Sequence, residues 1–342
     1  MTEPSPPALT LTAAIDALAS PYAMEDFSAL TRASSLVVDL RDTAPAADGE
    51  AAQRAQMTLA QLACPTIAIA QPSQANGSHA WSALFDVCLE DETDLATLDH
   101  NIRANPQASL AMVQLLRHSR GLSIHDGLTA ESLVYSTLQS GPEFATWLRD
   151  RKRPSVSAAA NEPAVIVIRD AETVHVTLNR PERHNAFSAE MRDAFAEVLQ
   201  VIDADASIRS VVLRGAGASF CSGGDLAEFG TLPDPATAHV IRSTRNPARL
   251  LARCADRVRC EVHGACVGAG AELPAFTSNV RAHRDATFWL PEVSMGLVPG
   301  AGGTVSLPRR IGAQRTNYLA LSGRRINSEQ ALQWGLVDEL SN

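Results

Sequence analysis

Three glycine-rich clusters, each associated with a run of apolar or β-branched residues, constrain this chain most. They occupy residues 220–226 (FCSGGDL), 262–273 (VHGACVGAGAEL) and 290–304 (LPEVSMGLVPGAGGT). Glycines after a strand let the backbone approach a ligand closely and turn its N–H groups outward. A helix that begins just after such a loop adds its positive end to the same place. Two such loops can aim two N–H donors at one oxygen that becomes negatively charged, as stabilising an oxyanion requires.

The second half of the chain alternates predicted strands and helices. Residues 164–168 and 174–178 are β-branched runs separated by residues 169–173, which predicts a hairpin. From residue 187 to residue 202, apolar side chains recur at three- and four-residue steps, which predicts an amphipathic helix with Ser188 as its N-cap. Residues 210–213 and 257–262 predict further strands. This alternation favours an α/β layered domain.

The first half has a different pattern. Residues 35–40 and 64–70 predict strands, and residues 95–117, 124–138 and 143–148 predict helices, the first interrupted near Pro106. The stretch 151–163 mixes charge, proline and small residues without periodicity, as a connector does. We therefore expect a first unit at 1–150, a linker at 151–163 and a catalytic domain at 164–342.

Composition excludes several classes of function. The chain has 342 residues and a net charge of −9, so we expect no nucleic-acid partner. No apolar run is long enough to span a bilayer, and the N-terminal residues lack the pattern of a signal peptide, so we expect a cytoplasmic protein without a membrane partner. The six cysteines form no C-x-x-C pair, so we expect reduced thiols and no metal site.

These clusters, together with residues 179–186 (NRPERHNA) and 321–338, resemble the enoyl-CoA hydratase/isomerase (crotonase) superfamily. The resemblance covers about residues 165–338, with the motifs in family order. It implies an α/β fold in which the catalytic domain is a crotonase-like spiral of ββα units. It also implies that Gly224 and Ala269 supply the two N–H groups of an oxyanion hole.

The same resemblance assigns further residues. Glu272 and Glu292 match the two family glutamates, and Gly300 matches the position that helps hold the catalytic water. Arg183, His184 and Ala186 lie in the region that lines the coenzyme A nucleotide. Three apolar residues are either acyl-pocket lining or simply core, since the two look alike in sequence: Phe288, Leu290 and Met295.

The presence of both glutamates favours a hydratase, which would be a lyase. Water must reach Cβ and a proton must reach Cα, and two carboxyl groups flanking one water can do both. Glu272 would activate or orient the water, and Glu292 would exchange the Cα proton. Such close carboxyls should titrate as a coupled pair with a raised pKa.

Other chemistry on an acyl-CoA stays open: isomerisation, decarboxylation, thioester hydrolysis, or a catalytically inactive coenzyme-A-binding subunit. The resemblance implies fatty acid metabolism, an acyl-CoA substrate, a homo-oligomer (a trimer or hexamer) and no metal or redox cofactor. Coenzyme A would enter only as part of the substrate.

Two departures from the family pattern matter. Ala269 replaces a usual glycine and can donate its N–H only if its φ is negative, and Pro274 requires a helix that starts very near Ala269. The family also normally continues past residues 335–337 with helices that cover the acyl pocket. Segments 85–90, 95–108 and 128–147 resemble those helices. We hypothesise that the first half is a degenerate crotonase-like unit whose helices cap the second half; an unrelated helical module is the alternative.

Alternative motifs are weak. The G-x-G-x-x-G pattern fails at Leu273, and the chain has no G-x-x-x-x-G-K-[ST] loop. Ser222 lies outside a G-x-S-x-G elbow because Phe220 stands where a glycine is needed. We therefore do not expect Cys221 or Ser222 to act as a nucleophile, and we expect Asp225 to shape its turn.

Overall fold

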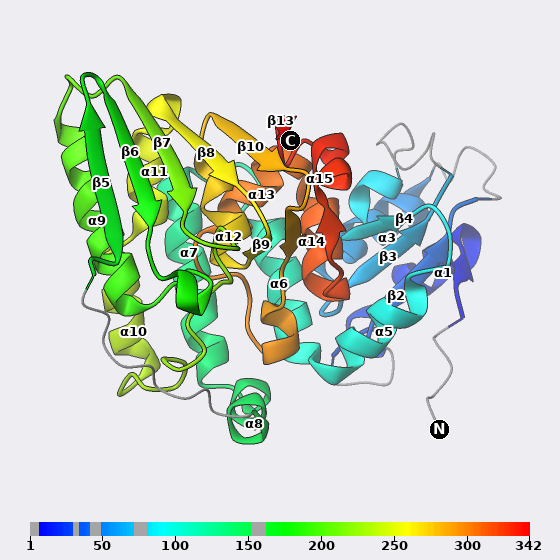
Figure 1. Cartoon of the computed structure of the whole chain (residues 1–342). Helices are drawn as coiled ribbons and strands as arrows, with labels where there is room; N and C mark the ends of the chain where they lie inside the picture. Colours follow the sequence, from blue (N-terminus) through cyan, green and yellow to red (C-terminus); the bar gives the residue numbers. More distant parts are fainter. Residues whose placement is uncertain (1–6, 30–33, 42–48, 72–80, 152–161) are drawn as a thin grey trace.

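The computed structural model describes residues 7–29, 34–41, 49–71, 81–151 and 162–342. Below, residues 7–151 are called the first half and residues 162–342 the second half. Each half carries a sheet, and helix α6 (Pro106–His118) lies between the two sheets (Figure 1). Within the described ranges, no helix is both long and apolar enough to cross a membrane.

The first half begins with a four-stranded parallel sheet in the spatial order β1-β2-β3-β4. Strands β2 and β3 are almost entirely buried, as expected for continuous apolar runs in a parallel sheet. Helices α1 and α3 pack against each other beside it. The elements are β1 (Leu9–Thr10), α1 (Leu11–Ala19), α2 (Ala23–Asp26), β2 (Leu36–Asp39), α3 (Glu50–Gln61), β3 (Thr66–Ile69), η1 (Ser82–Leu84) and β4 (Val87–Leu89).

Four consecutive helices follow this sheet. Pro106 separates the first two, because proline has no N–H to donate but fits the first turn of a new helix. Ser123 starts the third, since its hydroxyl accepts a hydrogen bond from Asp126 N at 3.1 Å. The helices are α5 (Leu95–Ala104), α6 (Pro106–His118), α7 (Ile124–Gln139) and α8 (Pro142–Asp150).

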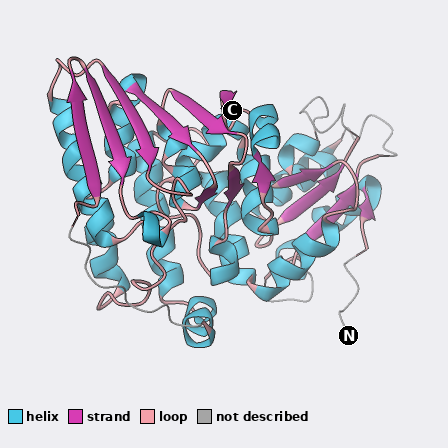
Figure 2. Cartoon of the chain, in the orientation of Figure 1, coloured by secondary structure: helices cyan, strands magenta, loops and turns pink. Residues whose placement is uncertain are grey.

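A six-stranded sheet in the order β13-β10-β8-β7-β6-β5 dominates the second half (Figure 2). Strands β5 and β6 form the predicted antiparallel hairpin, and the other neighbours are parallel. The hairpin turn is tighter than predicted, because both strands extend to leave only Ala171 and Glu172 between them. The strands are β5 (Val165–Asp170), β6 (Thr173–Leu178), β7 (Ser210–Gly215), β8 (Val258–Val262), β10 (Asn279–His283) and β13 (Glu339–Ser341).

A small sheet has the order β12-β11-β9, with β9 inside the second glycine-rich cluster and β11 directly before the third. Its strands are β9 (Ala265–Val267), β11 (Thr287–Trp289) and β12 (Ile326–Asn327). The helix predicted over 187–202 is α9, whose N-cap Ser188 accepts from Met191 N at 3.2 Å. The helices are η2 (Pro181–Arg183), α9 (Ala189–Ala204), α10 (Pro235–Thr244), α11 (Pro247–Arg253), η3 (Ala255–Arg257), α12 (Ala269–Glu272), η4 (Pro274–Phe276), η5 (Glu292–Met295), α13 (Gly303–Ile311), α14 (Ala313–Ser322) and α15 (Ser328–Trp334).

One hydrophobic core runs through both halves. It joins side chains of α5, α6 and α7 to side chains of the six-stranded sheet and of α13 and α14, for example Met112, Leu128, Val305 and Leu319. A second cluster belongs to the first half and fills the space between its sheet and helices α1 and α3. The halves are therefore packed into one body by burial of apolar surface.

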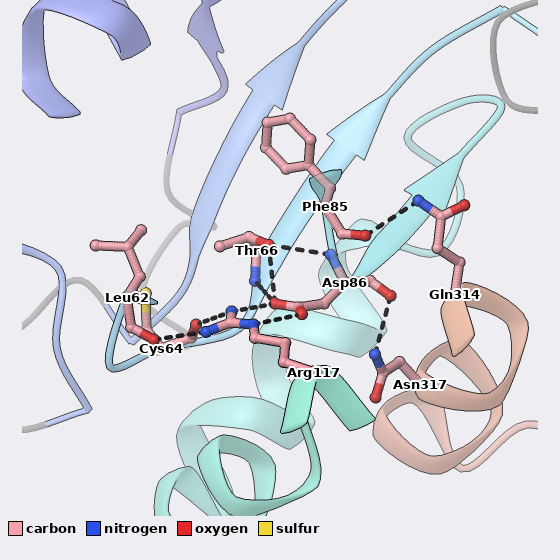
Figure 3. A network of polar contacts seen from close by, with 8 residues as sticks. All are labelled: Leu62, Cys64, Thr66, Phe85, Asp86, Arg117, Gln314 and Asn317. Carbon is pink, nitrogen blue, oxygen red and sulfur yellow. Dashed lines mark hydrogen bonds and ion pairs between the residues drawn. The ribbon is translucent and has the colours of Figure 1, made fainter. Parts of the chain in front are cut away.

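A buried polar network also joins the halves (Figure 3). The Asp86 carboxylate accepts from Thr66 N at 2.8 Å and from Arg117 Nε at 2.8 Å. From the second half, Gln314 Nε2 donates to Phe85 O at 3.0 Å and Asn317 Nδ2 donates to Asp86 O at 3.1 Å. The end of the first sheet is thus hydrogen-bonded to both α6 and α14.

The mixed α/β class expected from the sequence is confirmed by these elements. The domain boundaries stay a prediction, and most of the expected linker, residues 152–161, lies outside the described residues.

Candidate active site

A cavity of about 410 Å³ lies where α7 and α8 meet the glycine-rich loops of the second half. Both halves line it, so the first half covers a site in its own chain. From the first half come Leu128, Glu131, Ser132, Tyr135, Gln139, Phe144 and Leu148. From the second half come, among others, Phe187, Gly224, Phe229, Leu232, Arg242, Ala269, Glu272, Leu273, Glu292 and Gly300.

The first two glycine clusters run side by side at this cavity. Cys221 forms a parallel bridge with Cys266, and Val267 N donates to Cys221 O at 3.0 Å. A methyl group placed on Gly270 would lie 2.2 Å from Cys221 O. The close approach therefore needs glycine, and it brings the two loops into contact.

Gly224 and Ala269 both line the cavity, one from each loop. Neither amide donates a hydrogen bond to any part of the chain that the structure describes. Ala269 is the first residue of α12, where an N–H has no partner within the helix. At this turn Gly268 takes the positive φ of 48°, whereas the φ of Ala269 is negative. A negative φ at Ala269 is the condition under which its N–H can act as a donor.

Glu272 ends the four-residue helix α12 and is 1% exposed. Its Oε2 accepts from Ala301 N at 2.8 Å and from Gly303 N at 2.7 Å, at the start of α13. Backbone amides of the third glycine-rich cluster (residues 290–304) thus hold the carboxyl group of Glu272 from the second cluster.

Glu292, the first residue of η5, faces Glu272. A methyl group on Gly268 would lie 2.4 Å from Glu292 Oε1 and 3.6 Å from Glu272 Oε1. The other oxygen, Glu292 Oε2, is buried and has no hydrogen-bond partner among the described residues. The two carboxyl groups therefore converge on one point beside the Ala269 amide.

The electrostatics agree with the expected coupled pair. Burial raises the pKa of Glu292 to about 8. Burial, together with the neighbouring Glu292, raises the pKa of Glu272 well above its ordinary value. Since two like charges this close do not readily coexist, the pair holds a proton at neutral pH.

Gly300 lies in the cavity wall against Tyr135. A methyl group on Gly300 would lie 2.5 Å from the Tyr135 ring, so the approach of α7 requires glycine here. That Gly300 holds a catalytic water stays a prediction.

A third carboxyl group, Glu131 of α7, also reaches this region and was not predicted as a site residue. It is 3% exposed and accepts from Gly302 N at 2.8 Å and from Thr304 N at 3.0 Å. A signal was present in the sequence, because Glu131 lies on the same helical face as Leu128 and Leu138, where an apolar residue is expected.

The residues predicted to bind coenzyme A lie beside the first glycine loop. Ser222 N donates to His184 O at 2.9 Å, and the Arg183 guanidinium pairs with the Asp225 carboxylate. Arg183, His184 and Ala186 are absent from the cavity wall, although Asp225 is part of it. Their role in binding coenzyme A stays a prediction.

The structure favours the core reading over acyl-pocket lining at this cavity for Phe288, Leu290 and Met295. All three are at most 8% exposed and none lines it, because β11 and η5 pack into the protein interior behind the loops. The apolar lining comes instead from α7, α8, the residue before the N-cap of α9 and the segment before α10: Leu128, Phe144, Phe187, Phe229 and Leu232.

Other chemistry finds little support in this geometry. Burial raises the pKa of the Cys221 thiol to about 12, so it is a poor nucleophile. Asp225 Oδ1 accepts from Ala227 N at 3.0 Å, which is the predicted turn-shaping role. Across the described residues, no group of three or more His, Cys, Asp and Glu side chains is arranged to hold a metal ion.

The site is of a class that can hold a carbonyl group and exchange protons beside it: two amides without acceptors line an apolar cavity next to a proton-holding pair of carboxyl groups. Comparison with known proteins gives the class its family. The sequence profile of the family described as enoyl-CoA hydratase/isomerase matches residues 169–341.

Among curated relatives, the chain is 41% identical over 166 residues to the 1,2-epoxyphenylacetyl-CoA isomerase of Escherichia coli, covering 47% of this chain and 63% of the relative. It is 35% identical over 178 residues to the 2,3-dehydroadipyl-CoA hydratase of the same organism, covering 52% of this chain and 68% of the relative. The first match therefore spans less than two thirds of the relative's length.

Among solved structures, the enoyl-CoA hydratase of Thermoplasma volcanium is 32% identical, with a TM-score of 0.49 over 53% of this chain and 72% of that one. The chain belongs to the enoyl-CoA hydratase/isomerase family. The predicted fold class, a crotonase-like α/β second half with a first half that contributes helices, is confirmed. Helices α7 and α8 line the same cavity as Glu272 and Glu292 of their own chain, which is compatible with the capping hypothesis.

Proposed function

We propose that this protein is an enoyl-CoA hydratase, a lyase that adds water reversibly to a 2-enoyl-CoA thioester. The observation that carries the proposal is the convergence of Glu272 and Glu292 on one point beside Ala269 in a cavity that Gly224 also lines. An enzyme of this kind needs a place for one carbonyl oxygen and two carboxyl groups facing the adjacent carbons.

The proposed roles of the carboxyl groups follow from their hydrogen bonds. Two amides donate to Glu272 Oε2, which favours its charged form relative to a carboxyl without donors. Glu292 Oε2 has no donor among the described residues, which favours the protonated form. Hydration needs the shared proton of the pair on Glu292: Glu272 then takes a proton from water as the water oxygen bonds to Cβ, and Glu292 gives its proton to Cα.

The thioester oxygen gains negative charge as Cβ is attacked, and the amides of Gly224 and Ala269 would stabilise it. The enolate electron pair then forms the carbon–hydrogen bond at Cα, so the reaction consumes one water. The carboxyl pair keeps its single negative charge, which passes to Glu292 until a proton moves from Glu272 back to Glu292. Gly300 would hold the water, and Arg183, His184 and Ala186 would bind coenzyme A, which is part of the substrate. No metal or redox cofactor enters this scheme, and a homo-oligomer, either a trimer or a hexamer, is expected from the family.

Isomerisation of an enoyl-CoA is the second candidate, since the first relative named above is an isomerase. One base that moves a proton between carbons would suffice, and Glu292 has a free oxygen for that task. An inactive binding subunit is less well supported because both glutamates are present and buried together.

The test is the loss of ultraviolet absorbance when crotonyl-CoA and longer 2-enoyl-CoA substrates are hydrated. We expect Glu272→Gln and Glu292→Gln each to lower kcat by about 10²-fold or more, as loss of a general acid or base does. Glu329→Gln, an exposed side chain 73% accessible, is the matched control and should keep full activity. Isomerisation of a 3-enoyl-CoA that survives Glu272→Gln would favour the isomerase, and an inert wild-type protein would refute both.

A further inference from the structure

Glu131 brings a third carboxyl group to the candidate active site from the first half of the chain. Besides the amides of Gly302 and Thr304, its carboxylate accepts from Thr304 Oγ1 at 2.7 Å. A buried carboxyl group with three donors is fixed in place, and the turn that donates to it is fixed in return.

The hydrogen bonds of Glu131 alternate with those of Glu272 along a single turn. Glu272 accepts from Ala301 N and Gly303 N, whereas Glu131 accepts from Gly302 N and Thr304 N. Four successive amides at the start of α13 are thus shared between one carboxyl group of α12 and one of α7. Removing one carboxyl group would free the turn that holds the other.

The usual way to satisfy such amides is absent at this helix. Gly302 occupies the N-cap position of α13 and offers no side chain, whereas Ser or Thr is the common choice. A carboxyl group that is buried and brought from a distant helix is a costly substitute for a neutral cap next in sequence, so its presence calls for a reason beyond capping.

The charged groups around Glu131 give that reason. Glu272 of α12 and Glu292 of η5 lie close enough for its charge to raise the pKa of both. Arg242 of α10 packs over the Tyr135 ring at 4.7 Å, and its positive charge lowers the pKa of Glu131. His239 of the same helix faces Ser132 Oγ at 2.9 Å. Burial raises the pKa of Glu131 itself to about 7.

We propose that Glu131 is a positioning residue for the reaction: from α7 it fixes the 301–304 turn against Glu272, and as a third carboxyl group in the same buried site it acts electrostatically on Glu272 and Glu292. The proposal rests on the proposed function for its kinetic consequence, but not for its geometry. It also assigns the first half of the chain a part in catalysis through α7.

Glu131→Gln tests the charge. The variant removes one negative charge near Glu272 and Glu292, so both of their pKa values fall, and both limbs of the pH profile of kcat/KM move to lower pH, by about 0.5 unit or more. We expect kcat to fall about tenfold while KM changes less than about threefold, since the substrate is not touched. Thr304→Ser is the matched control: it keeps both the hydroxyl that donates to Glu131 and the carboxyl group itself, so both limbs should stay in place.

Glu131→Asp tests positioning alone. Its shorter side chain keeps the charge but does not reach both Gly302 N and Thr304 N, so we expect a lower kcat with unmoved limbs. Should Glu131→Gln fail to fold, this variant still decides the matter. Wild-type kcat in folded Glu131→Asp, or unmoved limbs in folded Glu131→Gln, would overturn the proposal.

A readout without substrate separates the two proposals. Carbon-13 NMR of glutamate-labelled protein follows the titration of Glu272 and Glu292, assigned by their Gln variants. We expect their pKa values to fall in Glu131→Gln even if the wild-type protein hydrates no enoyl-CoA. Unchanged titration would refute the role of Glu131, whereas inactivity of the wild type would refute the hydratase alone.

Discussion

Gly268 fixes the geometry of the candidate site at the scale of a single residue. Its φ of 48° and ψ of −115° are costly for any residue with a Cβ atom. Glu292 Oε1 lies 2.4 Å from the position that a Cβ atom on this residue would take. A glycine here lets the carboxyl pair close over the turn that presents the Ala269 amide.

Gly268→Ala should therefore impair both folding and chemistry. We expect a loss of about 1–3 kcal/mol in unfolding free energy and about 10²-fold in kcat, because Glu292 must move from its position. Urea unfolding and the hydration assay measure the two effects. Gly312→Ala is the control, since Gly312 has a φ of 81° but nothing within 4 Å of an added Cβ atom. Equal kcat losses in both variants would contradict the argument.

Residues of the candidate site differ in how well their role can be predicted from the neighbouring sequence. Glu272 and Glu292 could be predicted because each follows or precedes glycines in an ordered motif. Phe288 could not be assigned, because an apolar residue in a strand suits a core and a pocket equally well. Glu131 stands in an ordinary amphipathic helix, and its partners lie 171 to 173 residues away in the chain.

At the scale of elements, local chemistry explains what could be predicted. Ser188 and Pro106 mark the starts of α9 and α6, where their side chains suit a first helical turn. Pro274 limits α12 to four residues, Ala269–Glu272, before the chain continues as η4. This short helix leaves the Ala269 amide without a partner and Glu272 one turn further along, which is what the site requires.

The start of α13 shows what local sequence does not reveal. Its four donors are satisfied by Glu272 of α12 and Glu131 of α7, and neither is adjacent in sequence. Gly302 at the N-cap gives no hint of either partner. Such tertiary capping has no short-range signature, because the fold alone brings the three helices together.

At the scale of the whole molecule, the first half completes the site of the second. Helices α7 and α8 form one wall of the cavity, while the glycine loops form the other. Sequence patterns indicated the helices and the resemblance indicated their place, but only the fold shows that they cover their own chain. The degenerate crotonase-like origin of the first half stays a hypothesis.

The polar network around Asp86 should make the halves depend on each other. Arg117→Ala leaves the Asp86 carboxylate, whose side chain is 2% exposed, without its cation, so we expect a loss of about 3–5 kcal/mol in unfolding free energy. Arg54→Ala, which breaks an exposed pair with Glu50, should cost less than about 1 kcal/mol. Denaturant unfolding followed by circular dichroism measures both. Equal, small losses would show that the network contributes little.

The central claim is that the amides of Gly224 and Ala269 bind one thioester oxygen while Glu272 and Glu292 face the adjacent carbons. A crystal structure with a bound acyl-CoA tests it most directly. We predict both amide nitrogens within about 2.7–3.2 Å of the thioester oxygen, and both carboxyl groups on the side of Cα and Cβ. A thioester bound elsewhere, or an oxygen that contacts neither amide, would contradict the account.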